Sequence, residues 1–329
     1  MIQKIKIFIF LIFTSSILIS QNDEFKIEEF YPIEKSHSYI GFSVKYMGYA
    51  MVRGRFENYN GTFRYDENDI SKTSISLSID SNSIDTDHNW RDKDLKSKDW
   101  FDVEKFPKIL FVSQKALPTS TGFEITGELT IKDVTKEVVV RMDTPSGILN
   151  DIRGDSQVIL TGELTIDRTD FGVEGEKWSS IKEGITAVSE NVNIEVSILG
   201  KQMNLNNLKN WVSDTTKPTG KIYKAIADNG AEEGLRVFEE LMTNKNERID
   251  PRTLNTVGLI LLKEGNTNDA LKIFRKNIET YPKNDDAYDY YANGLAVSGD
   301  LKNAKFFYQK AIENNTDNQN AMEILRHLE

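Results

Sequence analysis

Residues 39–46 read Tyr-Ile-Gly-Phe-Ser-Val-Lys-Tyr, so that Ile40, Phe42 and Val44 alternate with small or polar residues. Successive side chains of a β-strand point to opposite faces, and this stretch therefore predicts a strand with one buried face. Turn residues such as Asn60-Gly61 bound further runs of the same kind. Those runs lie at 74–79, 121–131, 157–166 and 191–198. Seven or eight strands at this spacing predict an antiparallel sandwich or a closed barrel.

One segment of this half interrupts the alternation. Residues 85–105 read DTDHNWRDKDLKSKDWFDVEK, a highly charged stretch that carries Trp90, Leu95, Trp100 and Phe101. Such a pattern fits one or two short helices with loops better than a strand. Because it is inserted between strands, we expect it to cover one end of the barrel.

The second half of the chain has a helical period and repeats itself. Gly258 and Ala292 are 34 residues apart, and so are Phe274 and Tyr308. The repeated pattern of small and apolar residues resembles the 34-residue tetratricopeptide repeat, a helical hairpin that stacks on its neighbours. An all-α module is therefore expected over 218–329, with a divergent first helix pair. The polar segment 201–217 is the expected linker.

The first twenty residues differ from the rest. Lys4 and Lys6 precede an uncharged apolar run from Ile7 to Ile19, and small residues follow. This order is typical of a secretory signal peptide over 1–20. A retained anchor is the alternative, but about 13 apolar residues fall short of the roughly 20 that span a bilayer. We expect an exported protein, periplasmic or secreted, without a stable transmembrane span after cleavage.

Composition excludes several classes of protein. The 329 residues include 41 Lys and Arg against 51 Asp and Glu, a net charge of -10, and no cysteine. Disulfide scaffolds and cysteine chemistry are therefore absent from this sequence. Nucleic acid is not expected as a partner, because its binding relies on many cationic contacts. A hydrophobic content of 39% and the length suggest about two folded domains.

The order of several short motifs resembles the YceI-like family. The motifs are His37-Ser38-x-Ile40-x-Phe42-x-Val44, Arg91-Asp92-x-x-Leu95, Trp100-Phe101-Asp102, Phe106-Pro107-x-Ile109-x-Phe111 and Asp167-Arg168-Thr169-Asp170-Phe171-Gly172. The resemblance covers about 30–199 and implies a lipocalin-type barrel over 25–200. It also implies an elongated apolar cavity for a polyisoprenoid or fatty-acyl chain. Two positions depart from the family: Asp94 stands where His is common, and Asp133 where Gly is common.

The inward positions could simply fill a closed core, since an eight-stranded barrel is just wide enough for side chains or one ligand. The resemblance favours a cavity. The aromatic residues of 90–101 could be either a lid or core. The residues then expected to line the cavity are Ile40, Phe42, Val44, Phe56, Phe63, Leu77, Ile79, Trp90, Trp100, Phe101, Phe111, Leu129, Leu164 and Phe171.

Few residues suggest chemistry beyond binding. His37, Arg91 and Arg168 are candidates for contact with a ligand headgroup, because a guanidinium suits phosphate or carboxylate. The alternatives are a hydrogen-bonded structural role for His37 and, for the arginines, ion pairs such as Arg91 with Asp92. Asp85-x-Asp87-x-Asn89 begins like a calcium loop but has Trp90 where glycine is needed. No catalytic residue, metal or cofactor is predicted.

Three functions remain to be compared. The first is an exported, non-enzymatic protein that holds a long-chain apolar ligand and docks a protein partner through its helical repeats. The second is an interaction scaffold whose barrel has a closed core. The third is an enzyme acting on a lipid or quinone-like substrate, which predicts a titratable group of perturbed pKa inside the cavity. We expect the first.

Overall fold

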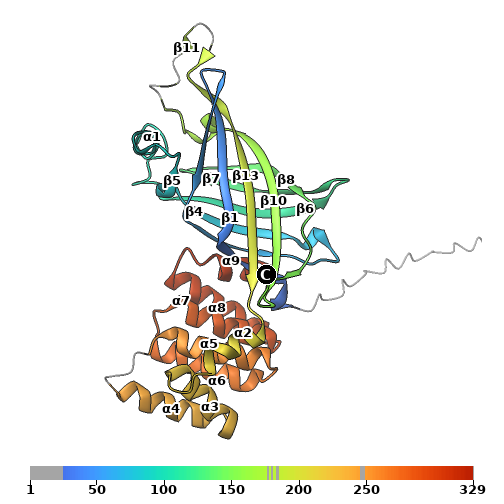
Figure 1. Cartoon of the computed structure of the whole chain (residues 1–329), viewed down its shortest axis with the longest axis vertical. Coiled ribbons are helices and arrows are strands. Elements are labelled where there is room, and N and C mark those ends of the chain that lie inside the picture. Colours follow the sequence, from blue (N-terminus) through green and yellow to red (C-terminus); the bar gives the residue numbers. More distant parts are fainter. Residues whose placement is uncertain (1–24, 176–177, 179–180, 183–184, 245–248, 329) are drawn as a thin grey trace, which may run out of the picture.

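The computed structural model describes residues 25–175, 178, 181–182, 185–244 and 249–328. The signal peptide expected over 1–20 lies outside these residues. The described chain forms a β-barrel and a stack of helices that lie end to end (Figure 1). This arrangement confirms the expected fold class, a mainly β domain followed by an all-α module. Within the described ranges, the structure contains no helix that is both long and apolar enough to cross a bilayer.

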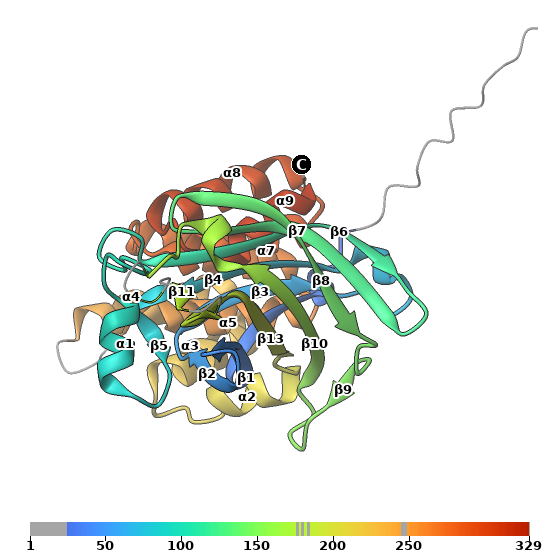
Figure 2. The ribbon, with the colours of Figure 1, turned by 90° about the horizontal axis from the view of Figure 1, so that it is seen from above.

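Among the described residues, eight antiparallel strands form the barrel wall. Their hydrogen-bonded order is β1-β13-β10-β8-β7-β6-β4-β3, and β3 pairs with the start of β1, which closes the ring. Figure 2 shows the twisted strands of the barrel from above. The wall strands are β1 (Phe30–Tyr46), β3 (Tyr59–Arg64), β4 (Ser74–Asp80), β6 (Lys108–Pro118), β7 (Gly122–Ile131), β8 (Val134–Asp143), β10 (Ser156–Asp167) and β13 (Val188–Gln202).

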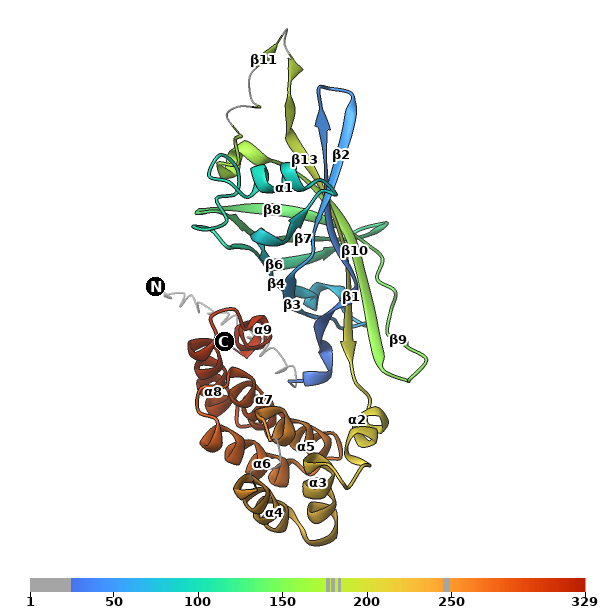
Figure 3. The same cartoon turned by 60° about the vertical axis from the view of Figure 1, so that its left-hand side comes forward.

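The strand β1 is long enough to pair with two different strands along the same edge. Its start pairs with β3 through Phe30–Pro32, and its end pairs with β2 (Ala50–Phe56) through Gly41–Tyr46. The β1–β2 hairpin therefore extends beyond the ring, away from the helices (Figures 1 and 3). Gly54 permits this pairing, because a Cβ at this position would lie 2.4 Å from the Phe42 ring.

The charged insertion lies at the same end of the barrel as this hairpin (Figure 1). It forms one α-helix, α1 (Asn89–Leu95), whose N-terminus is capped by the His88 ring. The other short elements are η1 (Ile27–Glu29), η2 (Ile70–Lys72), η3 (Ser81–Ser83), β5 (Ile84–Asp85), β9 (Leu149–Asn150), η4 (Arg168–Phe171), β11 (Ile181–Lys182) and β12 (Ile185–Thr186).

The helical module consists of stacked pairs. The helices α5, α7 and α9 begin 34 residues apart, in agreement with the repeat in the sequence. Gly258 of α5 lies against the Phe274 ring of α6, where a Cβ would come within 2.3 Å. The helices α5 and α6 thus pack closely at Gly258, as the small residue at this position of the repeat led us to expect. The helices are α3 (Pro218–Asn229), α4 (Ala231–Thr243), α5 (Pro251–Lys263), α6 (Thr267–Thr280), α7 (Asp285–Val297), α8 (Leu301–Asn314) and α9 (Gln319–Leu328).

The segment 201–217, expected to be a linker, is partly structured. The strand β13 continues to Gln202, and the helix α2 (Leu205–Val212) follows it. Leu208 and Val212 of α2 are buried beside Ile260 of α5. The overall polarity of the segment concealed this apolar spacing, which is that of an amphipathic helix. The linker expectation is therefore corrected to a short docked helix.

The last helix, α9, lies on the outside of the barrel wall at the junction of the two parts (Figure 3). The outward serines of β4 are buried beneath it: Ser76 donates to Gln319 at 2.7 Å, and Ser74 donates to Glu323 at 2.5 Å. Lys108 of β6 forms an ion pair with Asp317, just before the helix, at 2.8 Å. The two parts are thus joined by a buried polar contact as well as by the chain.

Candidate functional site

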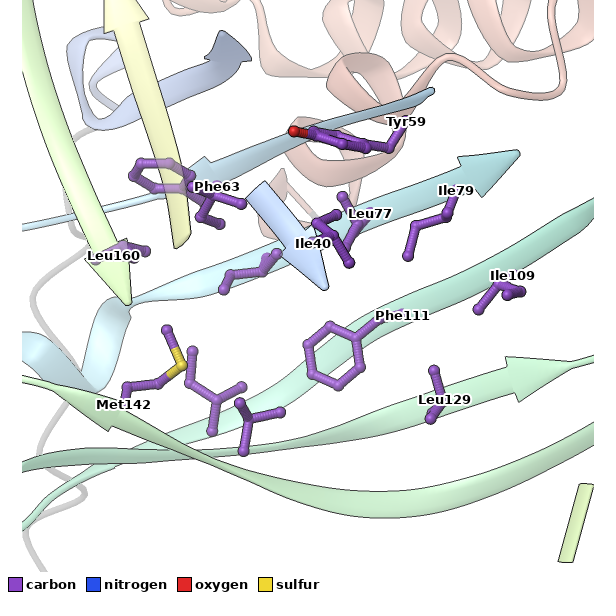
Figure 4. Close-up of a cluster of buried hydrophobic side chains, with 14 of the residues drawn as sticks. Ile40, Tyr59, Phe63, Leu77, Ile79, Ile109, Phe111, Leu129, Met142 and Leu160 are labelled. Carbon is purple, nitrogen blue, oxygen red and sulfur yellow. The ribbon is translucent and has the colours of Figure 1, made fainter. Parts of the chain in front are cut away.

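The barrel encloses a cavity of about 390 Å³. Most of its wall consists of the inward-facing aliphatic and aromatic side chains of the strands, several of which Figure 4 shows pointing toward one another across the barrel. These side chains come from alternate positions, as the pleat requires. The strands contribute Ile40, Phe42, Val44, Tyr46, Val52, Phe56, Ile75, Leu77, Ile79, Ile109, Phe111, Ile125, Leu129, Ile131, Val140, Met142, Leu164, Ile166, Val188, Val192, Ile194, Val196 and Ile198.

The cavity is closed at the end next to the helices. Tyr31 and Phe63 form a cross-strand pair between β1 and β3, and their rings stack with centroids 5.7 Å apart. Both side chains are buried, and neither lines the cavity. Tyr59 is buried on the same strand as Phe63, close to the helices (Figure 4). These aromatic side chains fill this end of the barrel.

The opposite end reaches the surface. Trp90 of α1 is 61% exposed and Tyr46 of β1 is 37% exposed, and both side chains also line the cavity. Phe101 makes an edge contact with Phe56 at 6.1 Å on the inner side of this rim. We call this end, bounded by α1 and the β1–β2 hairpin, the mouth.

The polar side chains of the lining gather at the mouth, and the carboxylate of Asp94 joins several of its segments. Its Oδ2 accepts hydrogen bonds from Nε1 of Trp100 at 3.2 Å and from Nε1 of Trp178 at 3.0 Å. Trp178 also contacts Trp90 edge to face at 6.2 Å. The acidic residue that departs from the family pattern therefore ties three segments together. Its charge is held by indole donors, which suit an anionic acceptor.

Arg91 and Asp92 both form hydrogen bonds with the buried residue Thr86 and not with each other. Arg91 donates from Nε to Oγ1 of Thr86 and from Nη2 to the Thr86 carbonyl, both at 2.7 Å. Asp92 accepts from the Thr86 backbone N–H at 2.8 Å. The ion pair considered between Arg91 and Asp92 is not what fixes this helix. Thr86 is the common partner, and Nη1 of Arg91 has no hydrogen-bond acceptor among the described residues.

Arg168 is almost completely buried and is held by backbone carbonyls. It donates to the carbonyls of Val173 and Glu174 at 2.5 Å, of Ser189 at 3.0 Å and of Val188 at 3.1 Å. Burial lowers the pKa of its guanidinium, while neighbouring carboxylates raise it. The group also lies over the Trp100 ring at 5.1 Å. Arg168 lines the cavity, but its hydrogen bonds fix the segment after η4 to β13.

Twelve of the fourteen residues expected at the cavity wall lie there. Phe63 belongs to the closed end, and Phe171 is buried in η4 outside the lining. His37 lies on an exposed part of β1, where its Nδ1 is 2.7 Å from Glu34, and it does not reach the cavity. Both predicted arginines are at the mouth. Trp90, Trp100 and Phe101 all line the cavity, but only Trp90 is exposed, while Trp100 is also buried in the barrel core and Phe101 packs against it.

Sequence reasoning missed several members of the site. Trp178 and His88 line the mouth without having been assigned there. Trp178 lies outside the alternating runs of the sequence, so no periodicity marks it. Among the described residues, no group of three or more His, Asp or Glu side chains is placed to hold a metal ion.

Comparison with known proteins agrees with this barrel. A family model described as YceI-like domain matches residues 31–199. A UPF0312 protein of Pseudomonas paraeruginosa is 36% identical over 146 residues, which are 44% of this chain and 76% of that protein. Protein YceI of Salmonella arizonae is 30% identical over 179 residues, or 54% of this chain and 87% of that protein.

Two solved structures are also similar to the barrel. BcnA of Burkholderia cenocepacia has a TM-score of 0.44 and 23% identity, covering 51% of this chain and 98% of that chain. A polyisoprenoid binding domain from Saccharophagus degradans has a TM-score of 0.40 and 14% identity, covering 53% of this chain and 98% of that chain. The family match ends at residue 199, before the helical module begins.

Proposed function

This chain belongs to the YceI-like family, and we propose that its barrel binds a polyisoprenoid or another long-chain apolar molecule. The observation that carries the proposal is the cavity of about 390 Å³, which is apolar along its length and polar only at the mouth. Its volume falls within the range of small-molecule sites, roughly 300–1,000 Å³. The open volume favours binding over the scaffold alternative, in which side chains would fill the barrel.

The distribution of polar groups gives the ligand a direction. Each buried methylene contributes roughly 0.8 kcal/mol, so the chain of the ligand is stabilised along the aliphatic wall. A polar headgroup would remain at the mouth, where Arg91 has Nη1 available. Of the three headgroup candidates, Arg91 is therefore the one we retain. The hydrogen bonds of Arg168 are directed to carbonyls, and His37 lies outside the cavity.

No chemical step is part of this proposal. Among the described lining residues, the Thr86 hydroxyl is engaged by Arg91 and Asp92, and the Asp94 carboxylate is held by two indole N–H groups. An enzyme acting on a lipid would need a titratable group directed at the chain. Holding a ligand requires only the apolar wall and a polar entrance.

The helical module adds a second element to the proposed function. We assign its hairpins to tetratricopeptide repeats, on the 34-residue spacing of α5, α7 and α9 and on the contact of Gly258 with Phe274. Stacked hairpins of this kind present a surface to a protein partner. The buried contact of α9 with β4 gives the module the further role of organising the barrel. We place the protein outside the cytoplasm on the signal-like sequence of 1–20.

Tryptophan fluorescence tests the binding proposal directly, because Trp90, Trp100 and Trp178 line the mouth. The full chain would be titrated with a long-chain polyisoprenol and, separately, with a fatty acid of matched length. We expect a saturable change in emission. Leu164→Phe, which adds a ring inside the cavity, should weaken binding at least tenfold, which corresponds to about 1.4 kcal/mol. Leu149→Phe, the same change on exposed β9, should not.

Two outcomes would contradict the proposal. One is the absence of saturable binding for either ligand by a folded protein. The other is an equal effect of Leu164→Phe and Leu149→Phe, which would mean that the observed signal arises outside the cavity.

A further inference from the structure

The tip of the β1–β2 hairpin exposes several large apolar side chains to solvent. Tyr49 is 90% exposed, and Met47, Met51 and Tyr46 are 46%, 43% and 37% exposed. These residues stand beyond the barrel ring, at the opposite end from the helical module (Figures 1 and 3). Isolated exposed apolar residues are ordinary, but four within six positions of one projecting hairpin form a patch. We call residues 46–51 the tip.

The hairpin that carries the tip has charges of one sign only, although Glu190 of the adjacent β13 lies beside Lys45. Residues 35–56 contain no Asp or Glu, although the whole chain has a net charge of -10. Lys45 and Arg53 flank the tip, and neither has an acidic partner among the described residues. Arg55, farther from the tip, is by contrast paired with Asp85. The tip therefore carries two available cations beside its apolar side chains.

The pairing of the two strands separates these groups by face. Val44 pairs with Val52, and Lys45 pairs with Met51. Val44, Tyr46 and Val52 line the cavity, so Lys45 and Met51 belong to the other face of the hairpin. The cavity wall and the exposed patch are thus two faces of the same hairpin.

Tyr46 connects the patch to the mouth, because its side chain is both exposed and part of the cavity lining. Across the mouth, Trp90 has the same two properties. Tyrosine and tryptophan are amphipathic and favour the boundary between water and lipid. A flat surface that received the tip would therefore also face the opening of the cavity.

We propose that the tip docks on an anionic lipid bilayer, so that the ligand passes between bilayer and cavity at the point of contact. Apolar side chains would enter the interface while Lys45 and Arg53 meet anionic headgroups, the combination that stabilises peripheral membrane binding. The transfer of ligand rests on the proposed function, whereas the docking itself does not.

Vesicle co-sedimentation of the full chain tests the docking. Vesicles of phosphatidylcholine with about one-third phosphatidylglycerol would be compared with pure phosphatidylcholine, at low and high salt. We expect binding to the anionic vesicles that weakens with salt, because headgroup attraction is screened. Replacing two of the four exposed apolar tip residues, Met47→Ser with Tyr49→Ser, should reduce binding about tenfold or more. Lys45→Glu with Arg53→Glu should abolish the preference for anionic lipid.

The chain offers a matched control for the tip variant. Leu149 and Ile152 are exposed apolar residues on and beside β9. Arg153 follows Ile152 directly, so this site, like the tip, has a cation beside its apolar side chains. Leu149→Ser with Ile152→Ser removes a similar apolar area at another site and should leave vesicle binding unchanged. An equal loss in both double variants would overturn the proposal.

Three further results separate docking from ligand binding. If the tip variant loses vesicle binding but keeps the tryptophan response to a polyisoprenol added in solution, docking is supported independently of the cavity. If no ligand binds but vesicle binding still depends on the tip, the docking holds and the proposed function fails. If the wild type ignores anionic vesicles, or the tip instead mediates a concentration-dependent dimer, the proposal is overturned.

Discussion

The indole Nε1 of Trp178 donates a hydrogen bond to Oδ2 of Asp94 at 3.0 Å, across 84 residues of sequence. This bond joins the segment before β11 to the helix α1, and it does so at the cavity mouth. Because Trp100 donates to the same oxygen, one carboxylate positions two of the aromatic residues that border the opening. The mouth is therefore shaped by a polar contact, while the rest of the cavity is shaped by apolar packing.

Asp94→Ala should loosen the mouth. Two indole donors would lose their acceptor, at a cost of about 1–3 kcal/mol if they remain buried. We expect faster ligand release and a larger exposure of Trp178, seen as stronger quenching of tryptophan fluorescence by acrylamide. Asp133→Ala, on the exposed turn after β7, is the matched control. Unchanged quenching in Asp94→Ala would contradict the assigned role of this carboxylate.

Glu323→Gln should weaken the junction of barrel and helices. Burial raises the pKa of Glu323, but the hydrogen bond of His327, the charge of Arg326 and the hydroxyl of Ser74 outweigh burial and hold that pKa below its usual range. A carboxylate whose folded pKa is lowered stabilises the fold above its unfolded pKa, and the contribution is lost as the pH falls through the folded pKa.

We expect Glu323→Gln to lower the free energy of unfolding by roughly 1–3 kcal/mol at neutral pH. The difference from wild type should shrink as the pH falls below about 4.5, where the unfolded carboxyl becomes protonated. Urea unfolding at pH 7 and in acid measures both. Glu313→Gln, on the exposed side of α8, should show neither effect. A difference that grows in acid would contradict the assigned network.

Asp289→Asn should act in the opposite direction. Asp289 of α7 is buried, and burial raises its pKa to about 7. Its Oδ2 accepts from Asn320 at 2.9 Å, but its Oδ1 has no hydrogen-bond partner in the described structure. Because the folded pKa lies above the unfolded one, wild type should lose stability as the pH rises from about 4 to about 7.

The amide carries no charge, so Asp289→Asn should be more stable than wild type above pH 7, by on the order of 1–3 kcal/mol. At about pH 4 the two proteins should be alike. Thermal unfolding at several pH values is the measurement, with Asp228→Asn on the surface of α3 as control. A variant less stable than wild type at pH 8 would show that the charged form is the one the fold requires.

Gly258→Ala should destabilise the helical module although alanine is the better helix former. The new methyl group would lie 2.3 Å from the Phe274 ring, and overpacking of this kind costs about 1–3 kcal/mol. Gly294→Ala is the control, because its nearest neighbour is a flexible leucine methyl group at 3.0 Å. Denaturant unfolding should separate the two variants, and equal stability would contradict the close packing of α5 against α6.

Alternation and repeat spacing predicted the two-part fold because both patterns report directly which face of an element is buried. Neither pattern reports depth along the barrel. Phe63 was therefore assigned to the cavity wall, although its pairing with Tyr31 places it at the closed end. The prediction for Phe171 was wrong for a related reason, because its side chain is buried in the 3-10 helix η4 and not on a strand of the alternating pattern.

The contacts between distant segments could not be predicted from either pattern. The serines of β4 alternate with its apolar residues, as a solvent-facing set would, yet α9 buries Ser76 and Ser74 through hydrogen bonds with residues 243 and 249 positions later. Trp178 likewise joins the mouth only because Asp94 is brought to it. The resemblance to a family gave the cavity itself, which alternation alone left open between a filled core and a ligand site.

Mass spectrometry of an organic extract tests the central claim, that the cavity holds a long-chain apolar ligand. The protein would be purified from its native host without detergent, beside Phe42→Asp in the cavity and Phe306→Asp on the exposed surface of α8. Circular dichroism would confirm that each variant folds, and Leu164→Phe would replace Phe42→Asp if that variant does not.

The account predicts a stoichiometric long-chain lipid in the wild type and in Phe306→Asp, and its loss from the cavity variant. A folded wild type that carries no such lipid, and takes up neither a polyisoprenol nor a fatty acid when they are offered, would contradict it.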